Sequence, residues 1–397
     1  MRLDVVILGG GIAGLWLLAR LRARGYRALL LEQAQLGAGQ TLASQGIIHG
    51  GLKYAIDRKL GQDSAALADM PARWRACLAG SGEINLGPGL LAAERHLFWA
   101  RRNLASRMAG FFGSKLVRGR VETLPPEAWP TALRDPQHVG AVYALDECVL
   151  DVPALLARLL ALNPDAIKQV NGETRLSMAE DHVVLDCLDG DGRPRRLQAS
   201  HVVATAGAGN EALLARTGLA PTLAQRRPLQ MLLLDNAPAP LWAHCFDTSD
   251  KPRVTITTHH RHDGSLVWYV GGLLAEQGAS QDEATLIQAA RREFALLLPR
   301  LDFSHSRYAG LRVDRAEGAT DDGSKPEGPV LRQPADWAGR CLLAWPTKLA
   351  LAPQLADQVL ALLPPPAAAD AAIELADWPA PGIAAAPWDC AAWREAA

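Results

Sequence analysis

The sequence predicts an α/β fold in which an antiparallel-sheet substrate domain of the α+β type is inserted into a Rossmann-like dinucleotide-binding domain. A glycine-rich strand–turn–helix–strand unit occupies residues 4–32, and a second strand ends in small residues at 199–209. Strand-like segments separated by turn residues fill 227–276. Further strands of the nucleotide fold are predicted at 306–313 and 341–343. The sheet at 227–276 therefore interrupts the nucleotide fold and is interpreted as an insertion.

Residues 4–32 have every part of a unit that holds a dinucleotide. A buried strand at 5–8 leads into three glycines that permit a tight turn, the approach of a pyrophosphate and close packing of the next helix, in the order Gly9, Gly11 and Gly14. The helix is predicted from Ile12 to about Arg24, and the N–H groups around Ile12 and Ala13 can hold phosphate. A second strand ends at Glu32, whose carboxylate can accept the ribose hydroxyls. These parts occur in order and at the expected spacing, which favours this interpretation over a simple glycine-rich turn.

The segment 199–209 is the second candidate for cofactor contact. It is an apolar strand that ends in Ala206 and Gly207, followed by a predicted helix at 210–217. A backbone with such small side chains can approach a bound cofactor closely. An ordinary strand-to-helix turn is the alternative, and the sequence leaves it open.

Bulk properties limit the class of protein. The chain has 397 residues, 49% hydrophobic and 21% charged, and a formal net charge of −1, which argues against nucleic acid as a partner. Its six cysteines are scattered without metal-ligand spacing, as is typical of reduced thiols. The first strand begins at residue 4, which leaves no room for a signal peptide, and no apolar run reaches the roughly 18 residues of a membrane span. We therefore expect a cytoplasmic protein, with no indication of peripheral membrane contact.

Residues 41–54, TLASQGIIHGGLKY, carry a likeness to a known family. Together with the glycine turn and Glu32 they resemble the D-amino-acid-oxidase superfamily of flavoproteins, and most of all its glycerol-3-phosphate dehydrogenase and 2-hydroxyglutarate dehydrogenase branches. Gly310-Leu311-Arg312 is similar to the family's G-x-R near the substrate. Thr347-Lys348-Leu349 with Leu355-Ala356 is similar to its K-L-T…L-A-E segment.

The resemblance implies bound FAD, with the isoalloxazine along Gly46–Gly51 and its pyrimidine end at Lys348-Leu349. Many glycerol-phosphate enzymes carry an arginine for the substrate phosphate where this chain has Gly46, so a phosphorylated substrate is not favoured. The residues expected to contact FAD are Gly9, Gly11, Ile12, Ala13, Gly14, Glu32, Gln33, Thr41, Ser44, Gln45, Gly46, Ile48, Ala206, Gly207, Gly310, Thr347, Lys348 and Leu349.

The predicted division of the chain follows from these assignments. We expect three FAD-binding parts at 1–75, 146–217 and 305–363, a substrate or cap part at 76–145, and the substrate sheet and helix at 218–304. The remaining segment, 364–397, is rich in Ala, Pro and Trp and is expected to be a C-terminal cover.

The expected chemistry is oxidation of a C–OH group to C=O by hydride transfer to flavin N5, which requires a base for the hydroxyl proton. His49 is the candidate base, since imidazole titrates near neutral pH and the resemblance places it over the flavin. The alternatives for His49 are a hydrogen bond to flavin or backbone, and covalent attachment of the flavin.

Four further residues are candidates for the substrate site. Arg312 is expected to clamp a substrate carboxylate, the alternative being an ion pair with Asp314 or Glu317. Lys348 could lie near flavin N1, hold the substrate or be a solvated lysine. Tyr54 and His259 could line the pocket, or Tyr54 could be a core residue. We predict no metal at the group His259, His260 and His262, because no Cys or Glu stands at ligand spacing.

The sequence therefore predicts an FAD-dependent dehydrogenase or oxidase acting on a small, anionic hydroxy acid or polyol derivative. An amine or amino-acid oxidase of the same fold is the first alternative, and a non-catalytic flavin-binding protein is the second. The electron acceptor is left open between oxygen, a quinone and a carrier protein.

Overall fold

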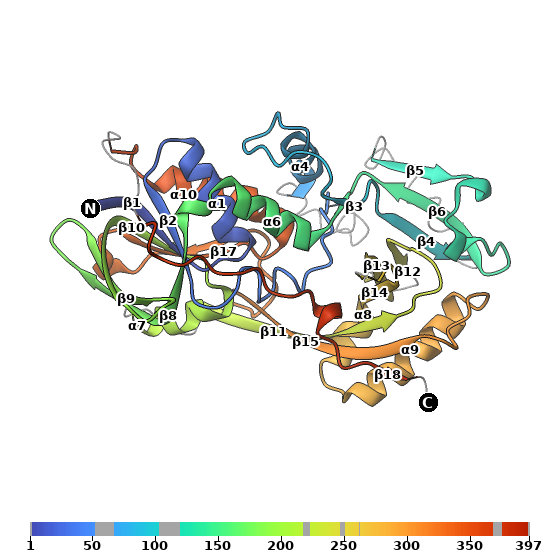
Figure 1. The fold of residues 1–397 in the computed structure, drawn as a ribbon. Helices are drawn as coiled ribbons and strands as arrows, with labels where there is room; N and C mark the ends of the chain where they lie inside the picture. The colour runs from blue at the N-terminus through green and yellow to red at the C-terminus, as the bar shows by residue number, and fades with distance from the viewer. Residues whose placement is uncertain are drawn as a thin grey trace.

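The computed structural model describes residues 2–51, 67–102, 120–216, 223–246, 251–261, 263–367 and 375–395. Two large sheets lie toward opposite ends of the molecule in Figure 1. One has seven strands and contains the N-terminal strand, and the other has nine strands. A mixed α/β fold with an additional antiparallel sheet was the fold class predicted from the sequence, and the prediction is confirmed.

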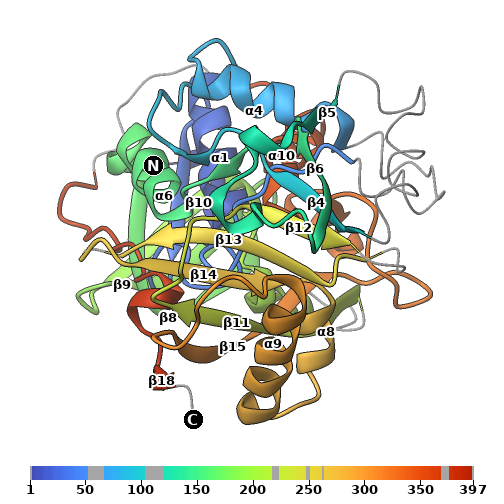
Figure 2. The same cartoon turned by 90° about the vertical axis from the view of Figure 1, so that its right-hand side faces the viewer.

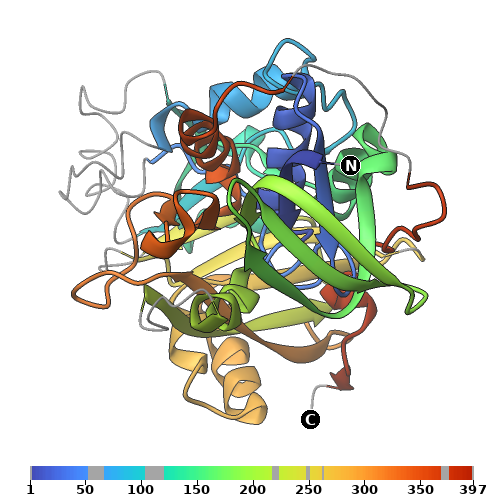
Figure 3. The ribbon, with the colours of Figure 1, turned by 90° about the vertical axis from the view of Figure 1, so that its left-hand side faces the viewer.

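The seven-stranded sheet is built around strand β1 (Arg2–Leu8), which pairs in parallel with β2 (Ala28–Glu32) and β10 (Pro194–Ala204). β10 in turn pairs in parallel with β17 (Cys341–Trp345), and β16 (Val330–Arg332) adds antiparallel to β17. β8 (Ile167–Met178) continues the parallel sheet beside β2, then joins β9 (Val183–Asp189) and β10 in an antiparallel meander. Figure 3 shows this meander beside the N-terminal strands.

Helices cover one face of this sheet. α1 (Ile12–Ala23) packs against α10 (Ala352–Leu362) and α6 (Val152–Leu162), and Val5 and Ile7 of β1 face them in one core cluster. The alternate residues Val6 and Leu8 face the other way, into a second cluster with side chains of β8 to β10. The strand is therefore buried on both faces, which explains why the sequence reads as a continuous apolar run rather than an alternating one.

The nine-stranded sheet is antiparallel except where β12 meets β4. In spatial order its strands are β18 (Arg394–Glu395), β15 (Arg307–Gly318), β11 (Ala224–Asp235), β14 (Leu266–Gly271), β13 (Val254–His260), β12 (Ala243–Phe246), β4 (Leu97–Arg101), β6 (Val139–Leu145) and β5 (Val121–Leu124). Helices α8 (Leu273–Gly278) and α9 (Glu283–Leu297) cover one face (Figure 2). The other face is directed toward the loop that contains Ala43, because Tyr269 donates its hydroxyl to the carbonyl of Ala43 at 2.8 Å.

The remaining elements are short. α4 (Met70–Leu78) lies against the core of the first sheet, where Trp74 donates its indole N–H to the carbonyl of Ala350. β3 (Leu91–Ala93) pairs with β7 (Val149–Leu150), and α7 (Asn210–Arg216) follows β10. The C-terminal segment 375–395 contacts both sheets, with Trp378 and Trp388 buried in different core clusters.

Three details differ from the sequence prediction. The strand at 306–313 was expected in the nucleotide fold, but β15 pairs along its whole length with β11 in the nine-stranded sheet. Residues 273–276 were expected to be strand and instead begin α8, after Gly272 turns the chain with a φ of 88°. The Asn-Gly pair at 171–172 does not form a hairpin turn. β8 continues through it with a bulge, and Gly172 adopts a φ of 71°.

Within the described ranges, no helix is long and apolar enough to cross a membrane. Five of the cysteines are buried as free thiols and Cys390 is exposed.

Candidate active site

The glycine turn after β1 lies against the end of β10. Gly9 has a φ of 107°, and a Cβ atom there would lie 2.7 Å from the Cα of Ala206. A Cβ on Gly14 would lie 2.1 Å from the carbonyl oxygen of Gly9. Only glycine fits either position, because the strand end, the turn and the helix are in direct contact. The structure thus brings together the two segments that the sequence predicted to approach a cofactor, the turn at 9–14 and Ala206-Gly207.

The N-terminus of α1 fits the phosphates of a dinucleotide. Gly11 precedes the helix and caps it with no side chain, while the N–H of Ile12 donates to Thr41 Oγ1 at 3.0 Å. First-turn N–H groups such as that of Ala13 have no partner within an α-helix and carry the positive end of its dipole. Glu32 is fixed at the end of β2, where its carboxylate accepts N–H bonds from Gly10 and from the residue two positions on. Gln33 beside it is exposed. The donors, the bare backbone and the carboxylate suit the ADP part of FAD, and their contacts with it stay a prediction.

The loop at 46–50 is held by the segment 147–150. The N–H of Leu150 donates to the carbonyl of Gly46 at 2.9 Å, and the N–H of Ile48 donates to the carbonyl of Cys148 at 2.9 Å. Gly46 has a φ of 70°, and a Cβ there would lie 2.3 Å from the carbonyl oxygen of Leu150. This backbone admits no arginine at position 46 without rearrangement, and the pairing carries His49 to Glu147.

The same loop is tied to the nine-stranded sheet. The amide Nε2 of Gln45 donates to the carbonyls of Thr255 and Tyr269, at 3.0 and 2.9 Å. The hydroxyl of Ser44 donates to the carbonyl of Thr41 at 2.7 Å, within the loop. Gln45 was predicted to contact FAD. Its amide nitrogen joins the loop to strands β13 and β14 of the nine-stranded sheet, while any contact of this loop with flavin stays a prediction.

The segment 347–349 lies at the start of α10. Thr347 has a φ of 63° and donates its hydroxyl to the carbonyl of Gly328 at 2.7 Å. The Nζ atom of Lys348 is buried, and Leu349 begins a 3-10 turn whose residue Leu351 shares a core cluster with Ile48. The segment and the loop at 46–50 therefore border the same hydrophobic core. Their contacts with flavin stay predictions.

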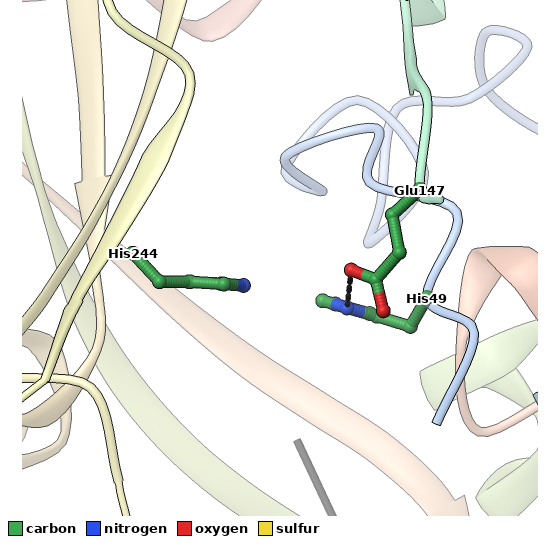
Figure 4. A group of neighbouring side chains, drawn as sticks. All are labelled: His49, Glu147 and His244. Atoms are coloured by element: carbon green, nitrogen blue, oxygen red, sulfur yellow. Dashed lines mark hydrogen bonds and ion pairs between the residues drawn. The ribbon is translucent and has the colours of Figure 1, made fainter. Parts of the chain in front are cut away.

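His49 lies within a cluster of polar side chains at the nine-stranded sheet, which we call the His/Glu cluster (His49, His96, Glu147 and His244). The Nδ1 atom of His49 lies 3.3 Å from Glu147 Oε2, and Glu147 Oε1 accepts the N–H of Gly50 at 2.8 Å. The His244 ring lies 5.9 Å from the His49 ring and nearly parallel to it. In Figure 4 a ring nitrogen of His244 points from the sheet toward His49, and the carboxylate of Glu147 lies above the His49 ring.

Burial and charge determine the proton positions in this cluster. Glu147 is 2% exposed, and this burial by itself raises the pKa of its carboxyl. The hydrogen bond and charge of His49 and the N–H of Gly50 outweigh burial, so the pKa of Glu147 is lowered. An ionised carboxylate only accepts hydrogen bonds, so we assign a proton to Nδ1 of His49. In the neutral ring the lone pair is then on Nε2. A carboxylate that orients a histidine in this way fixes it as a proton acceptor at Nε2.

The other two histidines line the far side of the cluster. His244 is on β12, and its Nδ1 lies 2.8 Å from Thr255 Oγ1 on the adjacent strand. The His96 ring packs 4.2 Å from that of His244. Burial lowers the pKa of His96 to about 3, so it is neutral. Beside this neutral ring, the carboxylate of Glu147 is ionised, because its pKa is lowered.

Arg312 and Gly310, which were predicted to face the substrate and the cofactor, do not join the His/Glu cluster. In the β11–β15 register Arg312 pairs with Gln230, on the sheet face opposite to His244, and it donates to the carbonyls of Ala279 and Gln281. Gly310 is on the same face as Arg312, and its N–H donates to Glu283 at the start of α9. The prediction that this segment faces the cofactor and substrate is not supported, because successive strand residues point to opposite faces.

His259 also takes a different role from the predicted one. It lies four residues from Thr255 on β13, roughly 13 Å along the strand, and its ring stacks on Trp388 of the C-terminal segment at 3.8 Å. Burial lowers its pKa to about 3. It packs the C-terminal segment onto the sheet instead of lining the cluster. Tyr54 and His262 lie outside the described residues.

Sequence reasoning missed Glu147, His96 and His244. Glu147 carries a partial signal, because it directly precedes the apolar residues Cys148–Leu150, but the neighbouring Asp146 and Asp151 carry the same charge. A charge next to a buried strand is costly unless it has a partner, so such a residue marks a polar site. His96 and His244 carry no comparable signal, since their approach depends on the parallel pairing of β4 with β12.

Comparison with known proteins identifies the family. Residues 4–344 match the family described as FAD dependent oxidoreductase, the D-amino-acid-oxidase type. The chain belongs to this family. It is 48% identical over 363 residues, 91% of this chain and 90% of the relative, to the probable FAD-dependent oxidoreductase PA4991 of Pseudomonas aeruginosa. The chain is thus an FAD-dependent oxidoreductase, as the glycine turn and the flavin-loop motif predicted.

Solved structures agree on the fold. The crystal structure of the Pseudomonas protein superimposes with a TM-score of 0.81 and 41% identity, covering 98% of both chains. Glycine oxidase from Geobacillus kaustophilus covers 95% of this chain and 97% of its own, with a TM-score of 0.64 and 20% identity. The FAD-bound L-alpha-glycerophosphate oxidase of Mycoplasma pneumoniae covers 91% and 95%, with a TM-score of 0.62 and 13% identity. The last two names belong to different substrate classes, so the fold by itself does not select a substrate.

Proposed function

We propose that this FAD-dependent oxidoreductase oxidises the C–OH group of a small hydroxy acid or polyol derivative, with His49 as the base. The observation that carries the proposal is the contact of His49 Nδ1 with the buried, ionised carboxylate of Glu147. When an alcohol is oxidised, its hydroxyl proton must leave together with the hydride, so the reaction needs a positioned base. An amine can keep its nitrogen lone pair and lose hydride without such a base.

The chain's own residues divide the work as follows. Glu147 holds the proton on Nδ1 of His49 and orients the ring, so that Nε2 takes the proton from the substrate hydroxyl. The developing imidazolium is stabilised by the adjacent carboxylate, which supplies a charge-assisted hydrogen bond. His244, held by Thr255, faces His49 and is placed to bind the substrate from the other side. We infer that these groups orient the substrate's carbon for the oxidation.

FAD, when bound at the glycine turn and along the loop 46–50, supplies the acceptor of two electrons for this oxidation. The electron acceptor that reoxidises it, the sign of the substrate's charge and the cytoplasmic location stay predictions from the sequence. Lys348, with its buried Nζ, is the candidate to balance charge that develops at the flavin.

The test is an anaerobic panel of hydroxy acids, polyols and amino acids, scored by loss of the visible absorbance of the flavin. We expect bleaching by at least one hydroxyl substrate. His49→Ala should keep the yellow cofactor and slow the bleaching roughly 100-fold or more. The matched control is His305→Ala, which removes an exposed histidine and should leave the rate unchanged.

Three results would contradict the proposal. Bleaching by amino acids alone would favour the amine oxidation suggested by the first alternative. An unchanged rate in His49→Ala would remove His49 from the proton transfer. Flavin that no small substrate reduces would favour a binding protein without turnover.

A further inference from the structure

Three members of the His/Glu cluster stand close enough to share one metal ion. His49 comes from the flavin-side loop, Glu147 precedes β7 and His244 lies on β12, and one ligand atom of each lies within 4.8 Å of the other two. The separation between His49 Nδ1 and Glu147 Oε2 is 3.3 Å. In a tetrahedral zinc site with bonds of about 2.0–2.2 Å, two ligand atoms stand about 3.4 Å apart. Two of the three ligands are therefore already at coordination distance from each other.

The ligands are oriented by outer contacts of the kind that metal sites use. His244 Nδ1 lies 2.8 Å from Thr255 Oγ1, and Glu147 Oε1 accepts the N–H of Gly50 at 2.8 Å. Ligating histidines and carboxylates in metal sites have such partners, which fix the ring nitrogen or oxygen that faces the ion. Glu147 and His244 are 2% and 3% exposed, so both are held by the surrounding sheet and loop.

We propose that His49, Glu147 and His244 form a binding site for Zn²⁺, and that the bound ion inhibits the oxidation. Two imidazoles and one carboxylate suit Zn²⁺, whereas Mg²⁺ and Ca²⁺ prefer sites made entirely of oxygen ligands. The fourth tetrahedral position is left to water or to a small anion. Within the described residues this is the one group of three or more His, Cys, Asp or Glu with this spacing.

The inhibitory part of the inference rests on the proposed role of His49. A zinc ion on Nδ1 takes the lone pair of that nitrogen, so the ring proton moves to Nε2 and no proton is released overall. His49 then has no acceptor for the substrate hydroxyl proton. Glu147 is also engaged by the ion and no longer stabilises an imidazolium. Zinc-bound enzyme is therefore expected to retain FAD but not to be reduced by the substrate.

The experiment is calorimetric titration of the FAD-loaded, chelator-treated protein with Zn²⁺, together with the visible spectrum of the Co²⁺-substituted protein at wavelengths beyond the flavin bands. We expect one tight site in the wild type, with the intense bands of tetrahedral Co²⁺. His244→Ala should weaken Zn²⁺ roughly 100-fold or more, and Thr255→Val about 10–100-fold, as for loss of an outer contact. His260→Ala, an exposed histidine of the same strand, is the matched control and should bind as the wild type does. Mg²⁺ should not compete.

Equal Zn²⁺ affinity in the wild type and His244→Ala would overturn the proposed site. If His244→Ala fails to fold, unchanged Zn²⁺ affinity in Thr255→Val would overturn it instead. FAD content and melting temperature identify that failure. If saturating Zn²⁺ left the reduction of the flavin by the substrate unaffected, the proposed inhibition would be overturned. The two proposals fail separately: no bleaching of zinc-free enzyme by any hydroxyl substrate removes the proposed oxidation, while the binding titration still decides the metal site.

Discussion

The substitution Glu147→Gln tests how the buried carboxylate acts on His49. Glutamine has nearly the same shape, and its amide oxygen can still accept the Gly50 N–H that Glu147 Oε1 accepts at 2.8 Å. The second oxygen, 3.3 Å from His49 Nδ1, becomes an NH₂ group that can only donate. It satisfies His49 only if the ring carries its proton on Nε2. The variant therefore reverses the tautomer and removes the proton acceptor, with little change in packing.

The size of the effect follows from the bond that is lost. A hydrogen bond to a charged group contributes about 1.5–3 kcal/mol, and each 1.36 kcal/mol is a factor of ten in rate. Flavin reduction should therefore slow roughly 10- to 150-fold. Substrate affinity should change much less, because Glu147 acts through His49.

The assay is anaerobic stopped-flow reduction of bound FAD by a hydroxyl substrate identified in the panel. The ¹⁵N shifts of the His49 ring give a readout that a merely structural role would not move, since they distinguish Nδ1–H from Nε2–H. Glu127→Gln, an exposed glutamate, is the matched control and should leave both rate and shifts unchanged. Wild-type rates in a fully FAD-loaded Glu147→Gln protein would refute the reasoning.

Three further predictions concern the cofactor, the substrate and stability. Gly14→Ala places a Cβ 2.1 Å from the Gly9 carbonyl, so FAD binding should be lost; retained FAD in the purified variant would contradict the turn geometry. Arg312→Ala should change substrate affinity by less than about threefold, because Arg312 binds loop carbonyls on the opposite sheet face; a large rise in KM would restore it as a clamp. Burial lowers the pKa of His259 to about 3, below its unfolded value of about 6.5, so the unfolded chain binds more protons and stability falls as pH drops through this window. Between pH 8 and pH 5 the free energy of unfolding, measured with denaturant, should fall by about 2 kcal/mol less in His259→Phe than in the wild type. Equal falls would show that His259 does not contribute to the pH dependence.

The sequence alone determined the cofactor half of this protein. The turn at 9–14, Glu32 and the strand ending at Gly207 are local patterns, and each depends on neighbouring residues and on backbone freedom. His49 was also within reach, because its motif follows the flavin loop directly. Local physics fixes such features wherever the rest of the chain goes.

Only the tertiary structure decided which side chains meet His49. Glu147 arrives through backbone pairing between two loops nearly a hundred residues apart, and His244 through the pairing of β12 with β4. The failure of Arg312 has the same origin, because one step along a strand moves a side chain to the other face of the sheet. The register of a strand and the sheet face of each side chain are set by long-range pairing, which a single sequence does not display. The sequence therefore predicted His49, and only the tertiary structure revealed Glu147 and His244.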